Sequence, residues 1–145
     1  RRDDRNGDRQ VGGRLVDPHA TGLDRNRLAM IVAVLGRHAG IALGASDIFV
    51  NVAGGVRIDE PAADLAVAVA IVSAHRGIAA RSGLVCFGEL GLTGGVRPVG
   101  QAERRLREAA KLGSTEALAP SGTVSVAGIT VRTAATLQEA IEEAF

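Results

Sequence analysis

The feature that most constrains the fold is a glycine pair followed by a long apolar segment, within residues 54–74. Gly54-Gly55 permits a sharp turn with positive φ. Pro61 suits the first turn of a helix, where its missing N–H leaves no hydrogen bond unmade. From residue 62 to residue 74 only Asp64 and one serine are polar. The segment therefore predicts a central helix that is buried on all sides.

The start of this helix is also a place where a functional site is expected, because turns that lead into a helix N-terminus often carry binding or catalytic groups. Asp59 or Glu60 stands where a carboxylate can accept the free amide hydrogens of the first turn. Residues 54–66 contain no serine, threonine, cysteine, lysine or histidine. The side chains that usually carry nucleophilic chemistry are thus missing from the turn.

Length and composition predict one folded domain, because 145 residues with 46% hydrophobic content can bury a substantial core. No apolar run reaches the ~18–20 residues that span a bilayer. No secretory leader opens the chain, so we expect a cytoplasmic location without membrane contact. The single Cys86, inside an apolar run, is expected to be a structural thiol.

The basic residues are sixteen arginines and one lysine, and forked guanidinium groups suit phosphate or carboxylate. The net charge of +1 does not by itself demand nucleic acid. Three phenylalanines without tyrosine or tryptophan disfavour recognition of single strands by stacking. Residues 1–20 are interpreted as a mobile Arg/Asp-rich arm, either solvated or in contact with a polyanion, before a domain over residues 21–145.

The spacing of apolar residues in the domain predicts the order α-β-α-β-β-α-β-β-α, which is a mixed α/β or α+β layered domain. The expected elements are a helix capped by Asp24 and ended by Gly40, a strand over 48–52, the central helix to Gly77, a strand over 84–88, a strand pair over 89–99 turning at Gly94-Gly95, a helix over 101–112, a strand over 117–120, a strand or hairpin over 123–132, and a last helix capped by Thr136.

The helix expected over residues 101–112 has two distinct faces. Its core-facing residues are expected to be Ala102, Leu106, Ala109, Ala110 and Leu112. Arg104, Arg107 and Lys111 share another face at helical spacing. That face is either an ordinary solvated surface or a strip that contacts phosphate.

Four separated blocks resemble the Lon-protease-like domain at the C-terminus of the bacterial RadA (Sms) family of DNA repair and recombination proteins. They are Gly22–Met30, the Gly-Gly-Val-Arg-Ile-Asp-Glu-Pro-Ala-Ala-Asp-Leu-Ala block (54–66), the Phe-Gly-Glu-Leu-Gly-Leu-Thr-Gly-Gly-Val-Arg-Pro-Val block (87–99), and Glu108–Gly113. The resemblance covers about residues 21–145 and implies the fold of the ribosomal protein S5 domain 2, as in the Lon proteolytic domain. The chain before residue 21 does not resemble the apolar strands of the family, which leaves the first sheet edge open.

The resemblance also implies a hexameric ring and, upstream in the full protein, a RecA-like ATPase domain and a zinc finger. This chain contains neither a Walker phosphate-binding motif nor a Cys-x-x-Cys zinc motif. ATP and zinc are therefore expected in the upstream domains, and no cofactor is expected here. His19, His38, His75 and Cys86 show no ligand spacing, so no metal is expected.

Lon-type peptidases place a serine nucleophile in Asp-Gly-Pro-Ser-Ala-Gly at the start of the central helix, and a lysine base at the start of the helix after the Gly-Glu strand. Ala62 occupies the serine position here, and the lysine position falls at or beside Glu103. A methyl group cannot attack a carbonyl, and a carboxylate cannot replace a neutral amine. Ser73 lies about three turns away. The resemblance therefore implies a relic site without catalytic residues.

Carboxylates could cluster near this relic site, and ion pairing with Arg57 or Arg97 is favoured over acid–base chemistry. They are Asp59, Glu60, Asp64, Glu89 and Glu103. The favoured function is a non-catalytic domain of a RadA-type ATPase, which scaffolds a hexamer and contacts the backbone of double-stranded DNA. The candidate DNA-binding residues are Arg57, Arg97, Arg104, Arg107 and Lys111.

The competing function is enzymatic. One form is a divergent Lon-type serine peptidase that uses another serine. The other is a phosphate-using enzyme on the S5-like fold, for which the acidic pair Asp59-Glu60 after Gly54-Gly55 is unfavourable, because it would repel phosphate.

Overall fold

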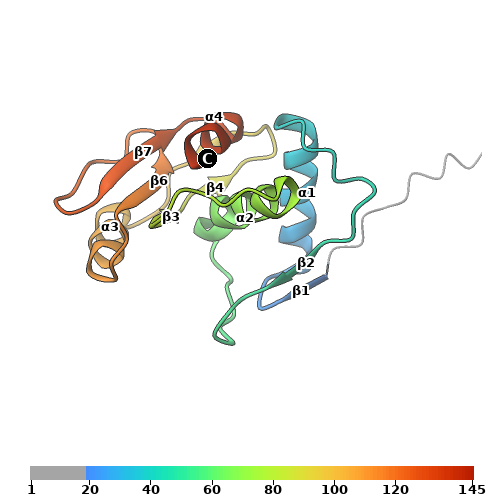
Figure 1. The fold of residues 1–145 in the computed structure, drawn as a ribbon, viewed down its shortest axis with the longest axis horizontal. Helices are drawn as coiled ribbons and strands as arrows, with labels where there is room; N and C mark the ends of the chain where they lie inside the picture. Colours follow the sequence, from blue (N-terminus) through green and yellow to red (C-terminus); the bar gives the residue numbers. More distant parts are fainter. Residues whose placement is uncertain (1–18) are drawn as a thin grey trace, which may run out of the picture.

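The computed structural model describes residues 19–145, in which short strands alternate with helices (Figure 1). The strands are β1 (His19–Thr21), β2 (Phe49–Asn51), β3 (Leu84–Cys86), β4 (Glu89–Leu90), β5 (Val96–Arg97), β6 (Glu116–Pro120) and β7 (Thr130–Ala134). The helices are α1 (Arg25–His38), the 3-10 turn η1 (Pro61–Ala63), α2 (Asp64–Arg76), α3 (Ala102–Lys111) and α4 (Leu137–Ala144). The arm was expected over residues 1–20. Residues 1–18 lie outside the described residues, and residues 19 and 20 are the first two residues of β1.

The strands form a mixed α/β fold dominated by parallel pairs. β1 pairs in parallel with β2, β3-β6-β7 form a parallel three-stranded sheet, and β4 and β5 form an antiparallel pair. The predicted α/β class is thus confirmed. The predicted turn between the strands of the 89–99 pair is also confirmed, with Gly94 at φ +85°. The observed order adds β1 before the first helix, and the strand expected over 84–88 and the strand pair expected over 89–99 are present as β3, β4 and β5.

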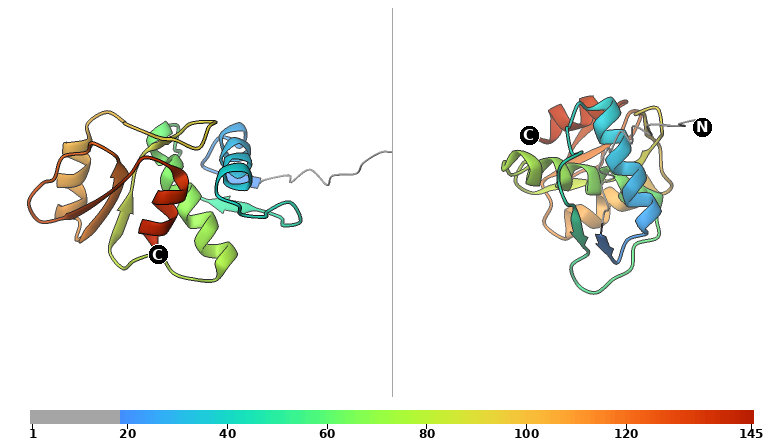
Figure 2. Two further views of the ribbon diagram at one scale, coloured as in Figure 1. Left: turned by 90° about the horizontal axis from the view of Figure 1, so that it is seen from above. Right: turned by 90° about the vertical axis from the view of Figure 1, so that its right-hand side faces the viewer.

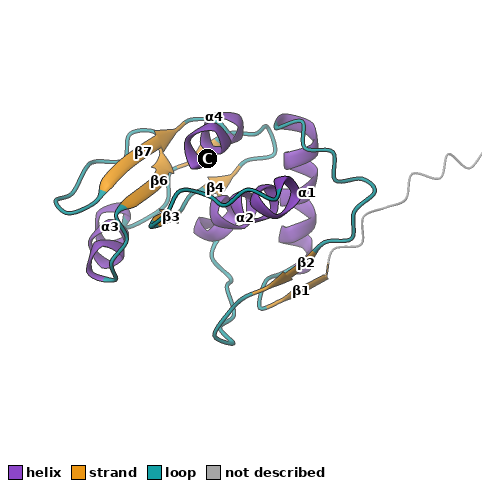
Figure 3. Ribbon diagram, in the orientation of Figure 1, coloured by secondary structure: helices purple, strands orange, loops and turns teal. Residues whose placement is uncertain are grey.

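The three-stranded sheet separates two apolar cores, and α4 and α3 lie on its opposite sides (Figures 2 and 3). Because successive strand residues point to opposite faces, Leu118 of β6 lies in the larger core with α1, α2 and α4, whereas Ala117 and Ala119 lie in a smaller core beneath α3. Helix α3 is therefore at one end of the molecule, and α1 is at the other (Figure 1).

Helix α1 forms as its sequence predicts. The Asp24 side chain accepts a hydrogen bond from the Arg27 backbone N–H at 2.9 Å and caps the first turn. Leu28, Ile31 and Leu35 are buried at helical spacing against the larger core.

Helix α2 corrects one prediction, because it is not buried on all sides. Leu65, Ala68 and Val72 are fully buried, but Ala70 and Ala74 are exposed. The exposed side lines an apolar hollow of about 730 Å³ together with β2. The apolar composition was correctly identified, but no described helix or strand covers this side.

One further prediction is wrong, and another holds only in part. Leu112 is 85% exposed, because α3 ends at Lys111 and the C-cap lies beyond the last turn that faces the core. Of the strand or hairpin expected over 123–132, only residues 130–132 lie in a strand, β7, and residues 123–129 form a loop. Because β7 runs parallel to β6, no hairpin forms around Gly128. No helix within residues 19–145 is both long and apolar enough to cross a bilayer.

Candidate functional site

The start of the central helix is held by backbone contacts rather than by a carboxylate cap. The Gly88 N–H donates to the Ala62 carbonyl at 2.9 Å, and the Gly88 carbonyl accepts from the Leu65 N–H at 3.1 Å. A Cβ on Gly88 would lie 2.9 Å from a Val96 methyl carbon, so glycine permits this close approach. Glu60 makes no side-chain capping bond. The expectation that Asp59 or Glu60 caps this helix is therefore wrong.

A partly buried ion pair between Arg27 and Asp64, which was not predicted from the sequence, fixes the first residue of α2 against α1. Asp64 is 1% exposed, and it accepts from Arg27 Nε at 2.5 Å, from Arg27 Nη2 at 2.7 Å and from the Leu90 N–H at 3.1 Å. The hydrogen bond with Asp64 raises the pKa of Arg27 above its ordinary value. A lone carboxylate that is buried in an apolar helix requires such a partner. This requirement was the signal in the sequence from which a cationic partner for Asp64 could have been predicted.

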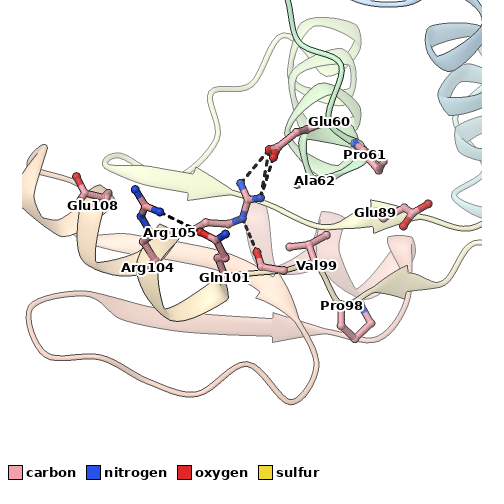
Figure 4. Close-up of a pocket in the computed structure, with 11 residues that line it drawn as sticks. Glu60, Pro61, Ala62, Glu89, Pro98, Val99, Gln101, Arg104, Arg105 and Glu108 are labelled. Atoms are coloured by element: carbon pink, nitrogen blue, oxygen red, sulfur yellow. Dashed lines mark hydrogen bonds and ion pairs between the residues drawn. The ribbon is translucent and has the colours of Figure 1, made fainter.

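A hollow of about 600 Å³ lies beside Ala62, between the start of α2 and the start of α3 (Figure 4). Its lining residues are Glu60, Pro61, Ala62, Glu89, Pro98, Val99, Gly100, Gln101, Arg104, Arg105 and Glu108. None of them is a serine, threonine, cysteine, lysine or histidine. The hollow consequently offers carboxylates and guanidinium groups but no ordinary nucleophile.

Arg105 bridges this hollow. Its Nη1 and Nη2 atoms each lie 3.2 Å from Glu60 Oε2, and its Nε donates to the Gly100 carbonyl at 2.9 Å (Figure 4). The bridge joins α3 to the segment that enters α2. No local pattern in the sequence identifies Arg105 as a site residue, because its partner Glu60 is 45 positions away in the chain.

The structure does not bring the two relic dyad positions into one hollow. Ala62 lines the hollow beside α2, whereas Glu103 lines a neighbouring hollow of about 490 Å³ and pairs with Arg107. Ser73 lies near the end of α2, where its hydroxyl donates to the Ile78 carbonyl at 2.6 Å.

The expected carboxylate cluster is divided among four arginines, of which Arg27 contacts both Asp64 and Glu89. Arg57 pairs with Asp59 at 2.9 Å on the exposed surface, and that hydrogen bond raises the pKa of Arg57. Glu89 lies 4.0 Å from Arg27 Nη2. The Arg97 guanidinium lies over Gly91, so that a Cβ on Gly91 would be 3.0 Å from Arg97 Nε.

The basic face predicted for α3 is present on the molecular surface. Arg104, Arg107 and Lys111 line the same hollow of about 490 Å³ together with Gln101, Glu103 and Glu108, and we call these six residues the α3 surface. Arg57 lines a different hollow, beside β1 and β2, and Arg97 lies on β5. The structure therefore groups three of the five candidate DNA-binding residues.

Cys86 has the character of a structural thiol, because burial raises its pKa to about 11. A thiol with so high a pKa is a poor nucleophile at neutral pH. Within residues 19–145, no group of three or more histidine, cysteine, aspartate or glutamate side chains is arranged to hold a metal ion.

The fold and the site together define a mixed α/β domain. The hollow at the start of α2 is lined by no ordinary nucleophile, and the α3 surface carries charges of both signs. A protein-family model described as subunit ChlI of Mg-chelatase matches residues 21–123. The DNA repair protein RadA of Brucella abortus is 54% identical over 101 residues, which cover 70% of this chain and 22% of that protein. RadA of Streptococcus pneumoniae is 45% identical over 131 residues, which cover 86% of this chain and 31% of that protein.

RadA of Haemophilus influenzae is 48% identical over 103 residues, which cover 71% of this chain and 22% of that protein. The chain belongs to the family of the DNA repair protein RadA, and its matched region is the domain that the ChlI model describes. The resemblance identified from the sequence is thus confirmed. The chain spans less than a third of the length of these relatives.

Proposed function

We propose that this chain is a non-catalytic, Lon-like domain of a RadA-type DNA repair and recombination ATPase, with the S5 domain 2-like fold. In that protein it would scaffold a hexameric ring and contact the backbone of double-stranded DNA without sequence preference. The observation that carries this proposal is the grouping of Arg104, Arg107 and Lys111 on one outward surface of α3. The name of the relatives, DNA repair protein RadA, agrees with a role on DNA.

The chemistry of the α3 surface suits phosphate. Arginine presents planar, forked donors to phosphate oxygens, and lysine adds a mobile charge. Contacts with phosphate position a protein on DNA but carry no sequence information. The chain has no tyrosine or tryptophan for stacking on bases. Binding is therefore expected to be electrostatic and sensitive to salt.

The non-catalytic part of the proposal rests on the hollow beside Ala62. Its lining side chains include no ordinary nucleophile, and Arg105 extends across it to Glu60. This hollow is also the observation that favours the alternative, a divergent Lon-type serine peptidase, since it lies where the resemblance places the peptidase site. A peptidase would need a serine from outside the lining residues.

The remaining partners follow from the RadA family. The proposed ring would be formed by copies of the full-length protein in the cytoplasm, and the upstream RecA-like domain and zinc finger would hold ATP and zinc. A ring repeats the α3 surface, so contacts that are weak in one domain add together.

The test is duplex binding measured by fluorescence anisotropy at low and moderate salt. The Arg104→Glu/Arg107→Glu variant should lose about tenfold or more in affinity at low salt, starting from the ~10⁻⁴–10⁻⁶ M typical of non-specific binding. An Arg37→Glu/Arg76→Glu variant makes the same charge change at exposed positions of α1 and α2 and is the matched control. Because the Arg76 guanidinium lies 5.6 Å from the centre of the Phe145 ring, a thermal melt checks that this variant keeps the wild-type stability. Light scattering checks that both variants keep the oligomeric state of the wild type.

If both arginine pairs reduce affinity equally, the binding reports net charge alone, and the α3 surface has no special role. If the α3 pair leaves affinity and salt dependence unchanged, the proposed DNA contact is wrong.

A further inference from the structure

We propose that Glu103 and Glu108 are built-in competitors of phosphate on the α3 surface, and that they restrict firm DNA binding to assemblies that present this surface several times. The inference rests on the proposed DNA contact and assigns its regulation. Two of the three cations that could bind phosphate are each held by a carboxylate of the same helix.

The contacts differ among the three cations. Arg107 Nη2 donates to Glu103 Oε1, and Lys111 Nζ donates to Glu108 Oε1 at 3.1 Å. Arg104 Nη1 instead donates to the neutral amide oxygen of Gln101 at 3.3 Å. Among the described residues, no carboxylate forms an ion pair with Arg104. A phosphate can therefore bind Arg104 without displacing an anion, whereas at Arg107 and Lys111 it must replace one.

These two ion pairs are solvent-exposed. The side chains are 65% and 54% exposed in the Arg107–Glu103 pair, and 72% and 57% exposed in the Lys111–Glu108 pair. Exposed pairs of this kind are weak, so an incoming phosphate can open them. The released carboxylates nevertheless stay on the same surface and repel the phosphate that displaced them.

The size of that repulsion decides whether it matters. Two unit charges about 7 Å apart in bulk water change an equilibrium constant by about threefold before screening by salt. Three cations and two carboxylates leave the α3 surface with a net charge of only +1. One domain is thus a poor ligand for a duplex, whereas a ring adds several Arg104-centred contacts.

Both ion pairs stabilise α3, because Glu103–Arg107 is an i,i+4 pair and Glu108–Lys111 is an i,i+3 pair, but the two carboxylates differ in their effect on the helix dipole. Glu103 lies in the first turn of α3, where a negative charge favours the helix dipole. Glu108 lies in the last turn, where a negative charge opposes it. Its contact with Lys111 neutralises a cation that could otherwise bind phosphate.

The experiment compares a Glu103→Gln/Glu108→Gln variant with wild type in anisotropy titrations of a fluorescent 20-base-pair duplex at two salt concentrations. Loss of two repulsions of about threefold each predicts about five- to tenfold tighter binding at low salt, with a smaller gain at moderate salt. An Asp47→Asn/Glu142→Gln variant removes two exposed carboxylates elsewhere and is the matched control, with an expected change below about twofold. Circular dichroism confirms that α3 remains helical.

The outcomes separate the inference from the proposed function. If the Arg104→Glu/Arg107→Glu variant weakens binding but the α3 glutamine variant matches wild type, the DNA contact stands and the inference is wrong. Equal tightening in the glutamine variant and its control also overturns the inference, because net charge then explains the gain. If no variant changes binding, or no duplex binding is detected, both proposals fail.

Discussion

At the scale of single residues, the start of α2 combines an alanine, where the resemblance places a serine, with an aspartate that fixes the structure. Ala62 presents a methyl group to the hollow where the resemblance places a serine. Two positions further on, Asp64 is buried and receives three hydrogen bonds from Arg27 and Leu90. Removal of one partner of a buried pair typically destabilises a protein by about 3–5 kcal/mol. The polar groups at this turn therefore have a structural role.

The first prediction at this scale is that a restored serine does not create a peptidase. Ala62→Ser alone lacks a base, since no lysine or histidine lines the hollow. Ala62→Ser/Glu103→Lys should also be inactive, because residue 103 lies on the neighbouring α3 surface and Arg105 spans the hollow. Hydrolysis of fluorescent casein and labelling by a fluorophosphonate probe should both stay at background, with an active Lon-type peptidase as the positive control. Hydrolysis by either variant would show that the two positions can meet.

At the scale of elements, local patterns predicted helices well and predicted their surroundings poorly. The cap of α1 and the basic face of α3 follow from spacing within one helix, so the sequence predicts both. The Arg27–Asp64 and Arg105–Glu60 pairs join residues 37 and 45 positions apart, which no local pattern specifies. The same limit explains the open side of α2, since apolar composition does not tell which neighbours cover it. It also explains β7, because a short strand looks alike in parallel and antiparallel pairs.

The second prediction follows from the two sides of α2. Val69 is 5% exposed in the larger core, so Val69→Asp buries an unpaired charge and should lower the free energy of unfolding by about 3–5 kcal/mol. Ala70 is the next residue but is exposed, so Ala70→Asp should lower it by no more than about 1 kcal/mol, which is mainly the difference in helix propensity between alanine and aspartate. Urea unfolding followed by circular dichroism measures both. Equal losses would mean that the apolar side of α2 is covered in solution.

At the scale of the whole molecule, the three-stranded sheet couples the two cores. Leu118 of β6 is fully buried in the larger core, and Leu106 of α3 is fully buried in the smaller one. The neighbouring β6 residues Ala117 and Ala119 contribute to the smaller core, so a single strand serves both. Disruption of β6 on one face must then disturb the packing on the other.

The last prediction is that both cores unfold in one transition. Leu106→Ala and Leu118→Ala each remove a buried side chain and should each lower the free energy of unfolding by about 2–5 kcal/mol. If β6 makes the cores one cooperative unit, each variant keeps a single transition with equal calorimetric and van't Hoff enthalpies. Each should also lose hydrogen-exchange protection in both cores, because the most protected amides report the global free energy. The opposite result is a Leu106→Ala variant in which α3 exchanges early while the larger core keeps wild-type protection. In that case α3 is a separable layer, and the α3 surface could move independently of the hollow beside Ala62.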